Sequence, residues 1–288
     1  MLTGFGRAKR KLPLALAIML SIAAVGQARA ASDPTTAAAL DAAINGEHRS
    51  DEARARDVFR KPRETLEFLG FRSDMTVVEV WPGTGWYTQV LAPALKDGGV
   101  FYAAQYGTNP RYGYQRRYFG AFLTMLGENP DLYRQVKVTH LALPYQLTIA
   151  PPGSADMVVS FRNVHNWMSE GYGSGRYAHL GFQAMYDALK PGGIMGIVDH
   201  RWPDPADEDP LAEDGYISSE RTVALAEAAG FVLIGESQIL RNPKDTHDHP
   251  QGVWSLPPSL ASGDTDRDKY LAIGESDRYL LKFQKPAE

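Results

Sequence analysis

Short apolar runs alternate with helical patterns along most of this chain. Runs of strand length predict seven β-strands, at residues 75–80, 100–104, 136–138, 155–161, 194–199, 231–240 and 278–283. Helical patterns lie between most of them, at residues 86–96, 116–126, 177–189 and 219–229. Strands that are apolar throughout, rather than at alternate positions, are typical of a parallel sheet covered by helices on both faces. The pattern therefore predicts a doubly wound α/β domain.

The last two predicted strands are connected differently from the others. No helical pattern separates Leu240 from Arg278, and the stretch between them is polar and contains four prolines. A long irregular segment inside a compact domain is typically a lid or an insert. Two strands joined without a crossover helix are expected to pair antiparallel. The sequence thus predicts a mostly parallel sheet of seven strands whose last strand runs antiparallel.

Two short helices are expected before the first strand. Ser50 is followed by two acidic residues, which is typical of an N-cap and the first turn of a helix. This helix should end near Arg60, because Pro62 has no N–H and disfavours helical geometry in the residue before it. Pro62 then begins a second helix, which we expect to close at Gly70.

The first 30 residues have the pattern of an export signal. Basic residues up to Lys11 precede an apolar run from Leu12 to Val25, and small residues at positions 28–30 then form a cleavage site. The apolar run is shorter than the roughly 20 residues that span a bilayer. We therefore expect cleavage before Ala31 and a periplasmic or secreted protein that is free of the membrane. The chain divides accordingly into a signal peptide (1–30), a loosely helical lead-in (31–50) and one domain (51–288).

Composition narrows the class of partner. The chain has 30 basic and 34 acidic residues, and its export segment contains basic residues but no acidic ones, so the mature protein is clearly acidic. This balance argues against a general nucleic-acid binder and leaves a small molecule as the expected partner. The chain has no cysteine, which excludes disulfides and a lipid anchor on cysteine. Its stability must therefore come from burial of a core.

A glycine-rich turn follows the first predicted strand. The segment Trp81-Pro82-Gly83-Thr84-Gly85 leads from that strand into a helix. Gly83 and Gly85 allow a tight turn and a close approach of a ligand to the backbone. Glu79, at the strand end, can accept a hydrogen bond from an ammonium or hydroxyl group of the ligand. A nicotinamide dinucleotide is disfavoured, because its G-x-G-x-x-G motif requires glycine where Thr88 stands.

The segment from Glu79 to Tyr87 resembles the first motif of class I S-adenosylmethionine-dependent methyltransferases. Together with other segments it resembles an exported bacterial branch of that group known as predicted methyltransferases. In chain order the segments are Arg56-Asp57, Arg60-Lys61-Pro62, Glu67 to Gly70, Pro82 to Thr88, Arg162 to Trp167, Asp199-His200-Arg201, Leu240 to Pro243 and Asp277 to Tyr279. The resemblance extends from about Arg54 to Pro286. It implies the seven-stranded, Rossmann-like methyltransferase fold, S-adenosylmethionine as cofactor and a small-molecule methyl acceptor.

The resemblance also implies a cofactor site at the glycine turn and the adjacent strand ends. The residues concerned are Glu79, Trp81, Pro82, Gly83, Gly85, Gln105, Leu141 and Asn163. Trp81 stands where the motif has a glycine, so its indole is expected to crowd the methionine end of the site. Gln105 replaces the acid that normally binds both ribose hydroxyls, and its neutral amide is a weaker partner. Leu141 stands where an acid is often found near the adenine.

Histidines and acids follow the carboxyl ends of the later strands, where ligands bind in open α/β sheets. His165 comes just after the fourth strand, and Asp199-His200-Arg201 ends the fifth. His247 and His249 lie with two aspartates in the segment between the last two strands. If the topology is as predicted, these side chains converge above the glycine turn. We expect Trp167 to line the substrate side of the same pocket, and Trp254 is similarly placed.

The first chemistry that fits this group is general base catalysis. His165 or His200 would remove a proton from the methyl acceptor, since histidine titrates near neutrality. Asp199 would orient the imidazole, and Arg201 would bind an anionic group of the substrate, with His247 and His249 also on the substrate side. Methyl transfer then depends mainly on alignment of the two reactants.

The second chemistry is a divalent metal site. His200, His247 and His249 with a carboxylate have ligand types that such ions accept, but His-x-His on an irregular loop is a weak signal. We therefore favour a site without metal. The departures at Trp81 and Gln105, and export away from the cytoplasm where S-adenosylmethionine is made, keep an alternative open. In that alternative the protein is an exported ligand-binding or metal-assisted protein that does not use S-adenosylmethionine.

Overall fold

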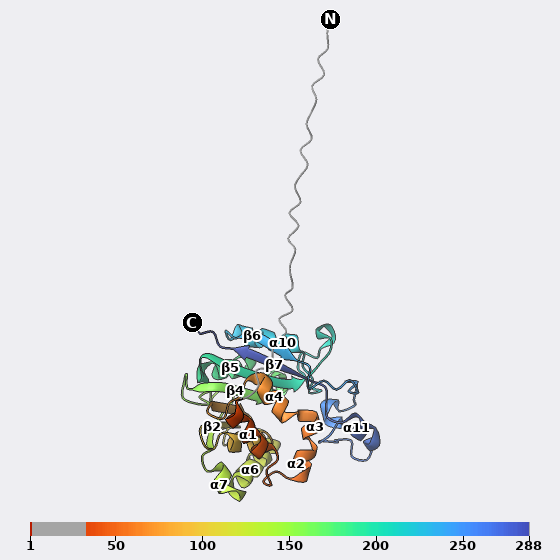
Figure 1. The fold of residues 1–288 in the computed structure, drawn as a ribbon. Helices are drawn as coiled ribbons and strands as arrows, with labels where there is room; N and C mark the ends of the chain where they lie inside the picture. The colour runs from red at the N-terminus through yellow and green to blue at the C-terminus, as the bar shows by residue number, and fades with distance from the viewer. Residues whose placement is uncertain (2–32, 288) are drawn as a thin grey trace. The chain divides into compact units, whose positions relative to one another are not determined.

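One mixed sheet organises the part of the chain that the computed structural model describes, residue 1 and residues 33–287 (Figure 1). Within it, seven strands lie in the order β3-β2-β1-β4-β5-β7-β6. Their bounds are β1 Thr76–Val80, β2 Val100–Gln105, β3 Lys137–His140, β4 Ala155–Phe161, β5 Leu189–His200, β6 Val232–Ser237 and β7 Arg278–Gln284. Neighbouring strands are parallel except where β7 pairs with β5 and with β6. The predicted doubly wound sheet with an antiparallel last strand is confirmed. The predicted signal peptide lies outside the described residues.

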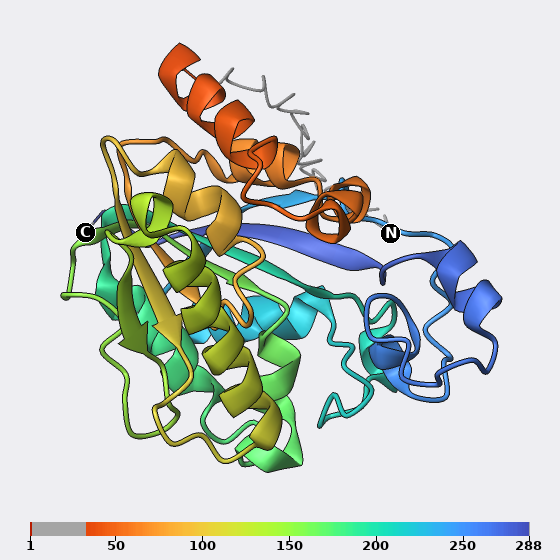
Figure 2. The same cartoon turned by 90° about the horizontal axis from the view of Figure 1, so that it is seen from below.

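Helices cover both faces of the sheet (Figures 1 and 2). On one face the core includes side chains of α1 (Pro34–Ile44), α4 (Pro62–Leu69), α5 (Thr88–Ala94), α6 (Gly113–Glu128) and α7 (Pro130–Tyr133). On the other it includes side chains of α8 (Val164–Met168), α9 (Ala178–Ala188) and α10 (Ser219–Ala228). In β1, Val77 faces the first layer and Val78 the second, which explains why the strand is apolar at successive positions. Among the described residues, no helix has both the length and the apolar character to cross a bilayer.

The expected caps form before β1, but the first predicted helix is interrupted. Ser50 caps α2 (Asp51–Ala55) by accepting a hydrogen bond from the Ala53 N–H, and the chain then turns at Arg56 into α3 (Asp57–Arg60). Pro62 opens α4, and Gly70 closes it in the left-handed conformation at φ 84°. The predicted lead-in contains α1, which is a regular helix that packs against α5 and buries Leu40.

The segment between β6 and β7 contains a helix that the sequence pattern did not predict. It is α11 (Arg267–Ile273), preceded by a 3-10 turn at Gly252–Ser255. The helix is seven residues long, Tyr270 is its one buried residue, and Asp266 begins it without a side-chain cap. A helix with one buried position has no apolar periodicity to detect. The antiparallel pairing of β6 with β7 is nevertheless as expected.

The close packing of α4 on β5 can be tested with two glycines. A Cβ at Gly196, in β5, would come within 2.5 Å of Leu69 Cδ1, and Leu69 is fully buried. We expect Gly196→Ala to lower the free energy of unfolding by about 1–3 kcal/mol through overpacking. Gly120, in α6, has no atom within 4 Å of its Cβ position. There the same change should raise stability by up to about 1 kcal/mol. Urea unfolding of both variants measures the difference, and equal effects would contradict this packing.

Candidate functional site

A cavity of about 540 Å³ opens where β1, β4 and β5 end. Its volume lies within the range of about 300–1,000 Å³ that is usual for small-molecule sites. The turn after β1 forms one wall with Pro82 and Gly83, and His165 and His200 form another. Tyr87 and Phe161, stacked with their ring centroids 3.5 Å apart, form an aromatic wall. The structure therefore brings the glycine turn and two of the predicted histidines to one cavity.

The two glycines of the turn serve different purposes. Both have left-handed backbones, with φ 62° at Gly83 and 93° at Gly85. A Cβ at Gly83 would meet only Tyr118, at 3.9 Å, and within the described residues the Gly83 and Thr84 N–H groups donate to no acceptor. A Cβ at Gly85 would instead lie 2.3 Å from Met125 Cε. Gly83 thus leaves the backbone open to a ligand, whereas Gly85 lets α6 pack on the turn.

Glu79 faces the cavity from the end of β1 as a buried acid. Its side chain is 2 % exposed and accepts a hydrogen bond of 2.6 Å from Thr88 Oγ1. Burial raises the pKa of Glu79 to about 8, although the Thr88 hydrogen bond and the Arg60 charge oppose the shift. Near neutral pH the group is therefore largely protonated, so it can donate a hydrogen bond as well as accept one.

Trp81 separates this cavity from a second one of about 440 Å³. Its backbone is in the left-handed region at φ 48°, which glycine adopts more readily. The indole is buried, and its Nε1–H donates to the Leu141 carbonyl at 2.8 Å. Tyr106 and Tyr172 pack against it with ring centroids 5.0 and 5.4 Å away. The indole is therefore directed toward the end of β3, at Leu141, and crowding of the methionine end stays a prediction.

Gln105, which the resemblance implied as the ribose partner, is used inside the protein. Its side chain is fully buried, its Nε2 donates to the Gly83 carbonyl at 2.7 Å and its Oε1 accepts from the Tyr106 N–H. It does not line the 540 Å³ cavity. The expectation of a ribose contact there is corrected, because both ends of the amide hold the loop. Leu141 lines the second cavity, and its carbonyl is bound by the indole of Trp81.

Asn163 lines the first cavity and joins two strand ends. Its Nδ2 donates to the Val80 carbonyl at 2.9 Å and to Ser160 Oγ at 3.1 Å. The side chain thus connects the end of β1 to the end of β4. From this position Asn163 can shape the predicted cofactor site.

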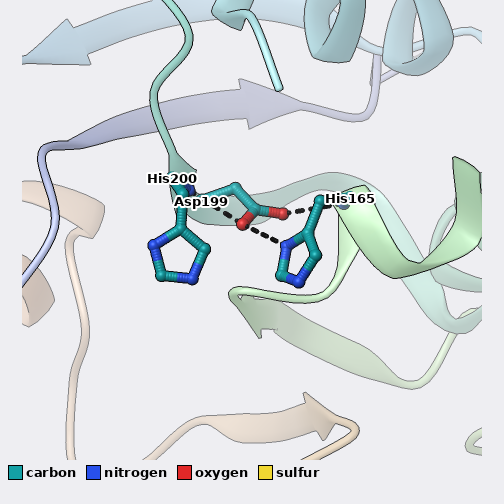
Figure 3. Close-up of side chains that lie close together, drawn as sticks. All are labelled: His165, Asp199 and His200. Carbon is teal, nitrogen blue, oxygen red and sulfur yellow. Dashed lines mark hydrogen bonds and ion pairs between the residues drawn. The ribbon is translucent and has the colours of Figure 1, made fainter. Parts of the chain in front are cut away.

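His165 and Asp199 form a buried pair on the opposite wall (Figure 3). His165, in the first turn of α8, is 5 % exposed, and its Nδ1 lies 2.7 Å from Asp199 Oδ1. Asp199 also accepts from the backbone N–H groups of His165 and His200. Asn166 Nδ2 donates to His165 Nε2 at 2.9 Å, so the ring proton resides on Nδ1. Asp199 therefore fixes the orientation of the imidazole, as expected.

His200 lies beside this pair, with its ring 5.2 Å from that of His165. Its Nδ1 is 2.5 Å from Ser276 Oγ. Burial is the main cause that holds the pKa of His200 well below its ordinary value, and the neighbouring His165 and nearby arginines lower it further. The ring is therefore neutral near neutral pH. His165, Asp199 and His200 each offer a ligand atom within 4.8 Å of the others, so a metal ion could bind here. This set differs from the His200, His247 and His249 set expected from the sequence.

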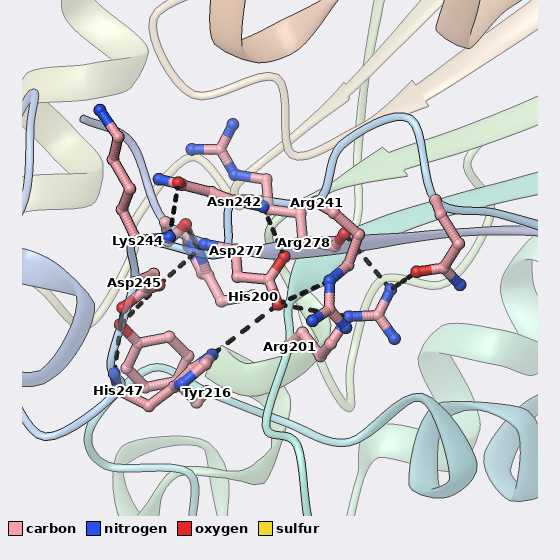
Figure 4. Close-up of polar contacts among 12 residues, drawn as sticks. His200, Arg201, Tyr216, Arg241, Asn242, Lys244, Asp245, His247, Asp277 and Arg278 are labelled. Atoms are coloured by element: carbon pink, nitrogen blue, oxygen red, sulfur yellow. Dashed lines mark hydrogen bonds and ion pairs between the residues drawn. The ribbon is translucent and has the colours of Figure 1, made fainter. Parts of the chain in front are cut away.

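The segment before β7 does not reach the cavity with its histidines. Figure 4 shows how His247 lies beside Tyr216 and Asp245. His249 Nε2 is bound to the buried Asp245 Oδ1 at 2.8 Å. His247 packs against Tyr216 with a ring distance of 5.1 Å. Asp245 also accepts from the Asp277 N–H, which attaches the segment to the start of β7. The expectation that these histidines meet the glycine turn is wrong, because Asp245 holds them on the far side of His200.

Arg201 and Trp167 are also placed elsewhere. Arg201 directs its guanidinium to Glu236 and Gln238 of the β6 region, at 3.4 and 3.2 Å (Figure 4). Trp167 is fully buried and packs against Phe182 of α9. Of the two tryptophans expected near the substrate, Trp167 and Trp254, it is Trp254 that lines the cavity. The predicted substrate contacts of both residues are therefore corrected. Arg201 follows His200 at the end of β5 and so points to the opposite face of the sheet, whereas Trp167 packs from α8 onto α9.

Three cavity arginines were missed from the sequence: Arg56, Arg60 and Arg162. They stand in segments that carry the methyltransferase resemblance, which was the available signal. Arg162 has φ 65°, an uncommon backbone for a residue with a side chain. Arg56 and Arg60 come from the helices before the sheet, whose contribution to a site at the strand ends depends on tertiary packing.

Similarity to solved structures identifies the fold. A S-adenosylmethionine-dependent methyltransferase from Aquifex aeolicus superimposes with a TM-score of 0.50 at 13% identity, over 80% of this chain and 93% of that one. The [4+2]-cyclase SpnF superimposes with a TM-score of 0.51 at 16% identity, over 88% of this chain and 94% of that one. No family model and no curated protein matches the chain. Because one of these structures is a cyclase, the fold alone does not specify the reaction. The chain has the class I methyltransferase fold.

The buried acid at the end of β1 predicts a pH dependence of stability. Because the pKa of Glu79 in the folded chain, about 8, lies above its ordinary value, the folded chain retains a proton that the unfolded chain releases. The resulting stabilisation is complete below pH 4.5 and is lost as pH rises through about 8, by at most about 1.4 kcal/mol per pH unit.

Glu79→Gln keeps an oxygen for Thr88 and removes this titration. We expect its free energy of unfolding to fall less than that of the wild type between pH 5 and 8. Glu128→Gln, an exposed change at the end of α6, should leave the wild-type slope intact. Urea unfolding across that range measures all three proteins, and parallel profiles for Glu79→Gln and the wild type would refute the shift.

Proposed function

We propose that the protein is a S-adenosylmethionine-dependent methyltransferase that acts on the oxygen or nitrogen of a small molecule. The observation that carries this proposal is that the open backbone at Gly83 and the His165–Asp199 pair face the same cavity. The fold neighbours support methyl transfer as the general kind of reaction. Neither feature alone would suffice, since many α/β proteins have a glycine turn at this position.

The residues of the first cavity fit the cofactor on the glycine side. Pro82, Gly83 and Thr84 would hold it, because no side chain obstructs Gly83 and two loop N–H groups lack acceptors in the described part of the chain. Bound there, S-adenosylmethionine would supply the methyl group. Gln105 offers no comparable fit, since its amide is committed to the Gly83 carbonyl. We therefore assign the cofactor to the Gly83 side of Trp81.

His165 has the arrangement of a general base. Its Nε2 carries the basic electron pair, which accepts a hydrogen bond from Asn166 Nδ2 that the methyl acceptor must displace, and Asp199 accepts the Nδ1 proton at 2.7 Å. When Nε2 takes a proton from the acceptor, the carboxylate stabilises the imidazolium that forms. His200, neutral and 5.2 Å away, can accept a hydrogen bond and orient the same group. The enzyme's main contribution is then alignment of the acceptor and exclusion of water.

The Trp81 indole favours a second candidate, a binding or metal-assisted protein that does not use S-adenosylmethionine. The indole lies between Gly83 and the end of β3, and its bond to the Leu141 carbonyl fixes it there. The nucleoside position expected toward Gln105 and Leu141 is therefore separated from the Gly83 turn by this ring. His165, Asp199 and His200 would supply the ligands of a metal ion in this case.

Calorimetric titration with S-adenosylmethionine and with its demethylated product tests the first candidate. We expect binding at micromolar dissociation constants, and a loss of about tenfold or more in Gly83→Ala, whose Cβ projects into the cavity. Gly153→Ala is the matched control. Gly153 has almost the same backbone, φ 63° against 62°, with no atom within 4 Å of the Cβ position. Both variants therefore carry the same backbone penalty, and only one alters the cavity.

The same experiment can reject the methyltransferase. Absence of binding by the wild-type protein, or equal binding by Gly83→Ala and the wild type, would remove it. Stoichiometric metal in the purified protein, lost when His200→Ala removes one ligand and retained in the distant His179→Ala, would then establish the metal-assisted candidate. His179 lies in α9 and does not line the cavity.

A further inference from the structure

Four arginines lie around the carboxylate of Glu275, and three of them, Arg56, Arg60 and Arg162, line the first cavity. Arg56 Nε lies 2.5 Å from Glu275 Oε1, and Arg60 Nε lies 3.2 Å from Oε2. Arg278 also contacts Oε2 through Nη2. Arg162 completes this arginine cluster, but its guanidinium makes no hydrogen bond or ion pair within the described residues. Glu275 therefore partners three of the four cations.

The cluster lies on the same side of the glycine turn as the candidate base. Arg162 follows β4, and Arg278 begins β7 opposite His200 of β5. In the sheet, β4, β5 and β7 extend from β1 in the direction away from β2, where Gln105 lies. A ligand group bound by the arginines would therefore lie beside His165 and His200 rather than toward Leu141.

Positive charge exceeds negative charge around the cluster. Burial would raise the pKa of Glu275, but Arg278, Arg60 and Arg56 outweigh it and hold that pKa far below its ordinary value. Burial, and then Arg278, lower the pKa of Arg162 to about 10. Glu79, the other acid of this wall, is largely protonated near neutral pH. Glu275 is the carboxylate that pairs with the cluster, and Asp199 adds a smaller attraction for Arg162, so the four guanidinium groups outnumber the carboxylates around them. Buried charges of one sign require a counter-charge.

Several donors of the cluster are also without partners. Within the described residues, Arg56 Nη2, Arg60 Nη2 and Arg278 Nε are buried and make no hydrogen bond. Arg60 and Arg278 are each only 2 % exposed, so bulk water cannot readily satisfy them. Leaving a buried donor unpaired is unfavourable, and more so for a charged group. The ion pairs of Arg56 and Arg60 with Glu275 attach α2 and α3 to the segment before β7, which gives these two arginines a structural role. Among the residues described, Arg162 has no such role.

Arg162 is held toward the cavity by its backbone. The left-handed φ of 65° is fixed by the bond from its N–H to the Val198 carbonyl, at 2.7 Å. Such conformations persist where the surroundings impose them and are concentrated at functional sites. The stacked rings of Tyr87 and Phe161 lie beside it and provide an apolar surface. The part of the cavity at Arg162 thus combines planar guanidinium donors with an aromatic wall.

We propose that the arginine cluster binds a carboxylate or phosphate group of the methyl acceptor, which is therefore an acidic small molecule with an apolar or aromatic body. Guanidinium groups suit these anions because their paired N–H groups match two oxygens. The assignment to the acceptor rests on the proposed methyltransferase function. The presence of an anion site follows from the cluster itself and also holds under the second candidate function.

Benzoate, inorganic phosphate and the neutral benzamide are suitable probes for calorimetric titration of the whole chain. We expect benzoate or phosphate to bind the wild type and benzamide not to bind. Arg162→Gln and Arg162→Gly remove the unpaired cation, and the glycine variant also suits the φ of 65° and protects the test against misfolding. Both should weaken anion binding by about tenfold or more, as expected for loss of a charge-assisted contact.

Arg72→Gln is the control, because Arg72 is half exposed and pairs with Asp74 away from the cavity. Its anion affinity should stay at the wild-type value. Equal affinities in the Arg162 and Arg72 variants, or equal binding of benzoate and benzamide, would overturn the proposal. Failure of the wild type to bind either anion would also overturn it.

A second titration, in the presence of saturating demethylated cofactor, identifies the source of the anion. Unchanged benzoate affinity supports an acceptor group at the arginines. Mutual exclusion would show that the cluster holds the cofactor's own carboxylate and would overturn the assignment to the acceptor. If the anions bind but neither form of the cofactor does, the methyltransferase proposal fails while the site for an acidic ligand stands.

Discussion

The position of the Trp81 indole is the constraint on which the site depends. The motif that this turn resembles has glycine there, and the backbone at φ 48° retains a conformation that glycine favours. The hydrogen bond to the Leu141 carbonyl and the packing of Tyr106 and Tyr172 hold the ring in place. The edge of the sheet is thereby divided into two cavities. A ligand of this site therefore lies either on the Gly83 side of the ring or on its Leu141 side.

The cavity on the Gly83 side combines groups that are seldom buried together. A protonated acid, a histidine fixed by an aspartate and a neutral second histidine lie within an aromatic shell. In such a shell, electrostatic interactions are less screened than in water, so each polar group needs a partner. Asp199 has three hydrogen bonds and satisfies this need, whereas the arginine cluster does not. The candidate base therefore has its hydrogen-bond partners, whereas the arginine cluster retains buried donors without a partner in the described part of the chain.

The sequence predicted the sheet and the part of the site at His165 and Asp199, and the reasons can be identified. Strands buried on both faces are apolar throughout, and Ser50 and Pro62 act through local backbone chemistry that needs no tertiary context. His165 and Asp199 were brought together correctly because parallel strands end at the same edge.

The failures concern residues whose direction is set by long-range packing. The position of His249 in the chain does not reveal that the buried Asp245, four residues before it, would bind its ring. The arginines before the sheet could not be placed without knowing where α3 packs. Gln105 was assigned by its place in a motif, and the change from acid to amide allowed it to bond to the loop instead.

A crystal structure of the protein with the demethylated form of the cofactor tests the proposed cofactor position at Gly83. We expect ligand density between Gly83 and His165, with the Trp81 indole still bonded to the Leu141 carbonyl. Density on the Leu141 side, with the indole rotated away from that carbonyl, would contradict the role of Trp81 as a fixed wall. Crystals with no ligand at either position, grown at a concentration that saturates known class I methyltransferases, would contradict the cofactor assignment.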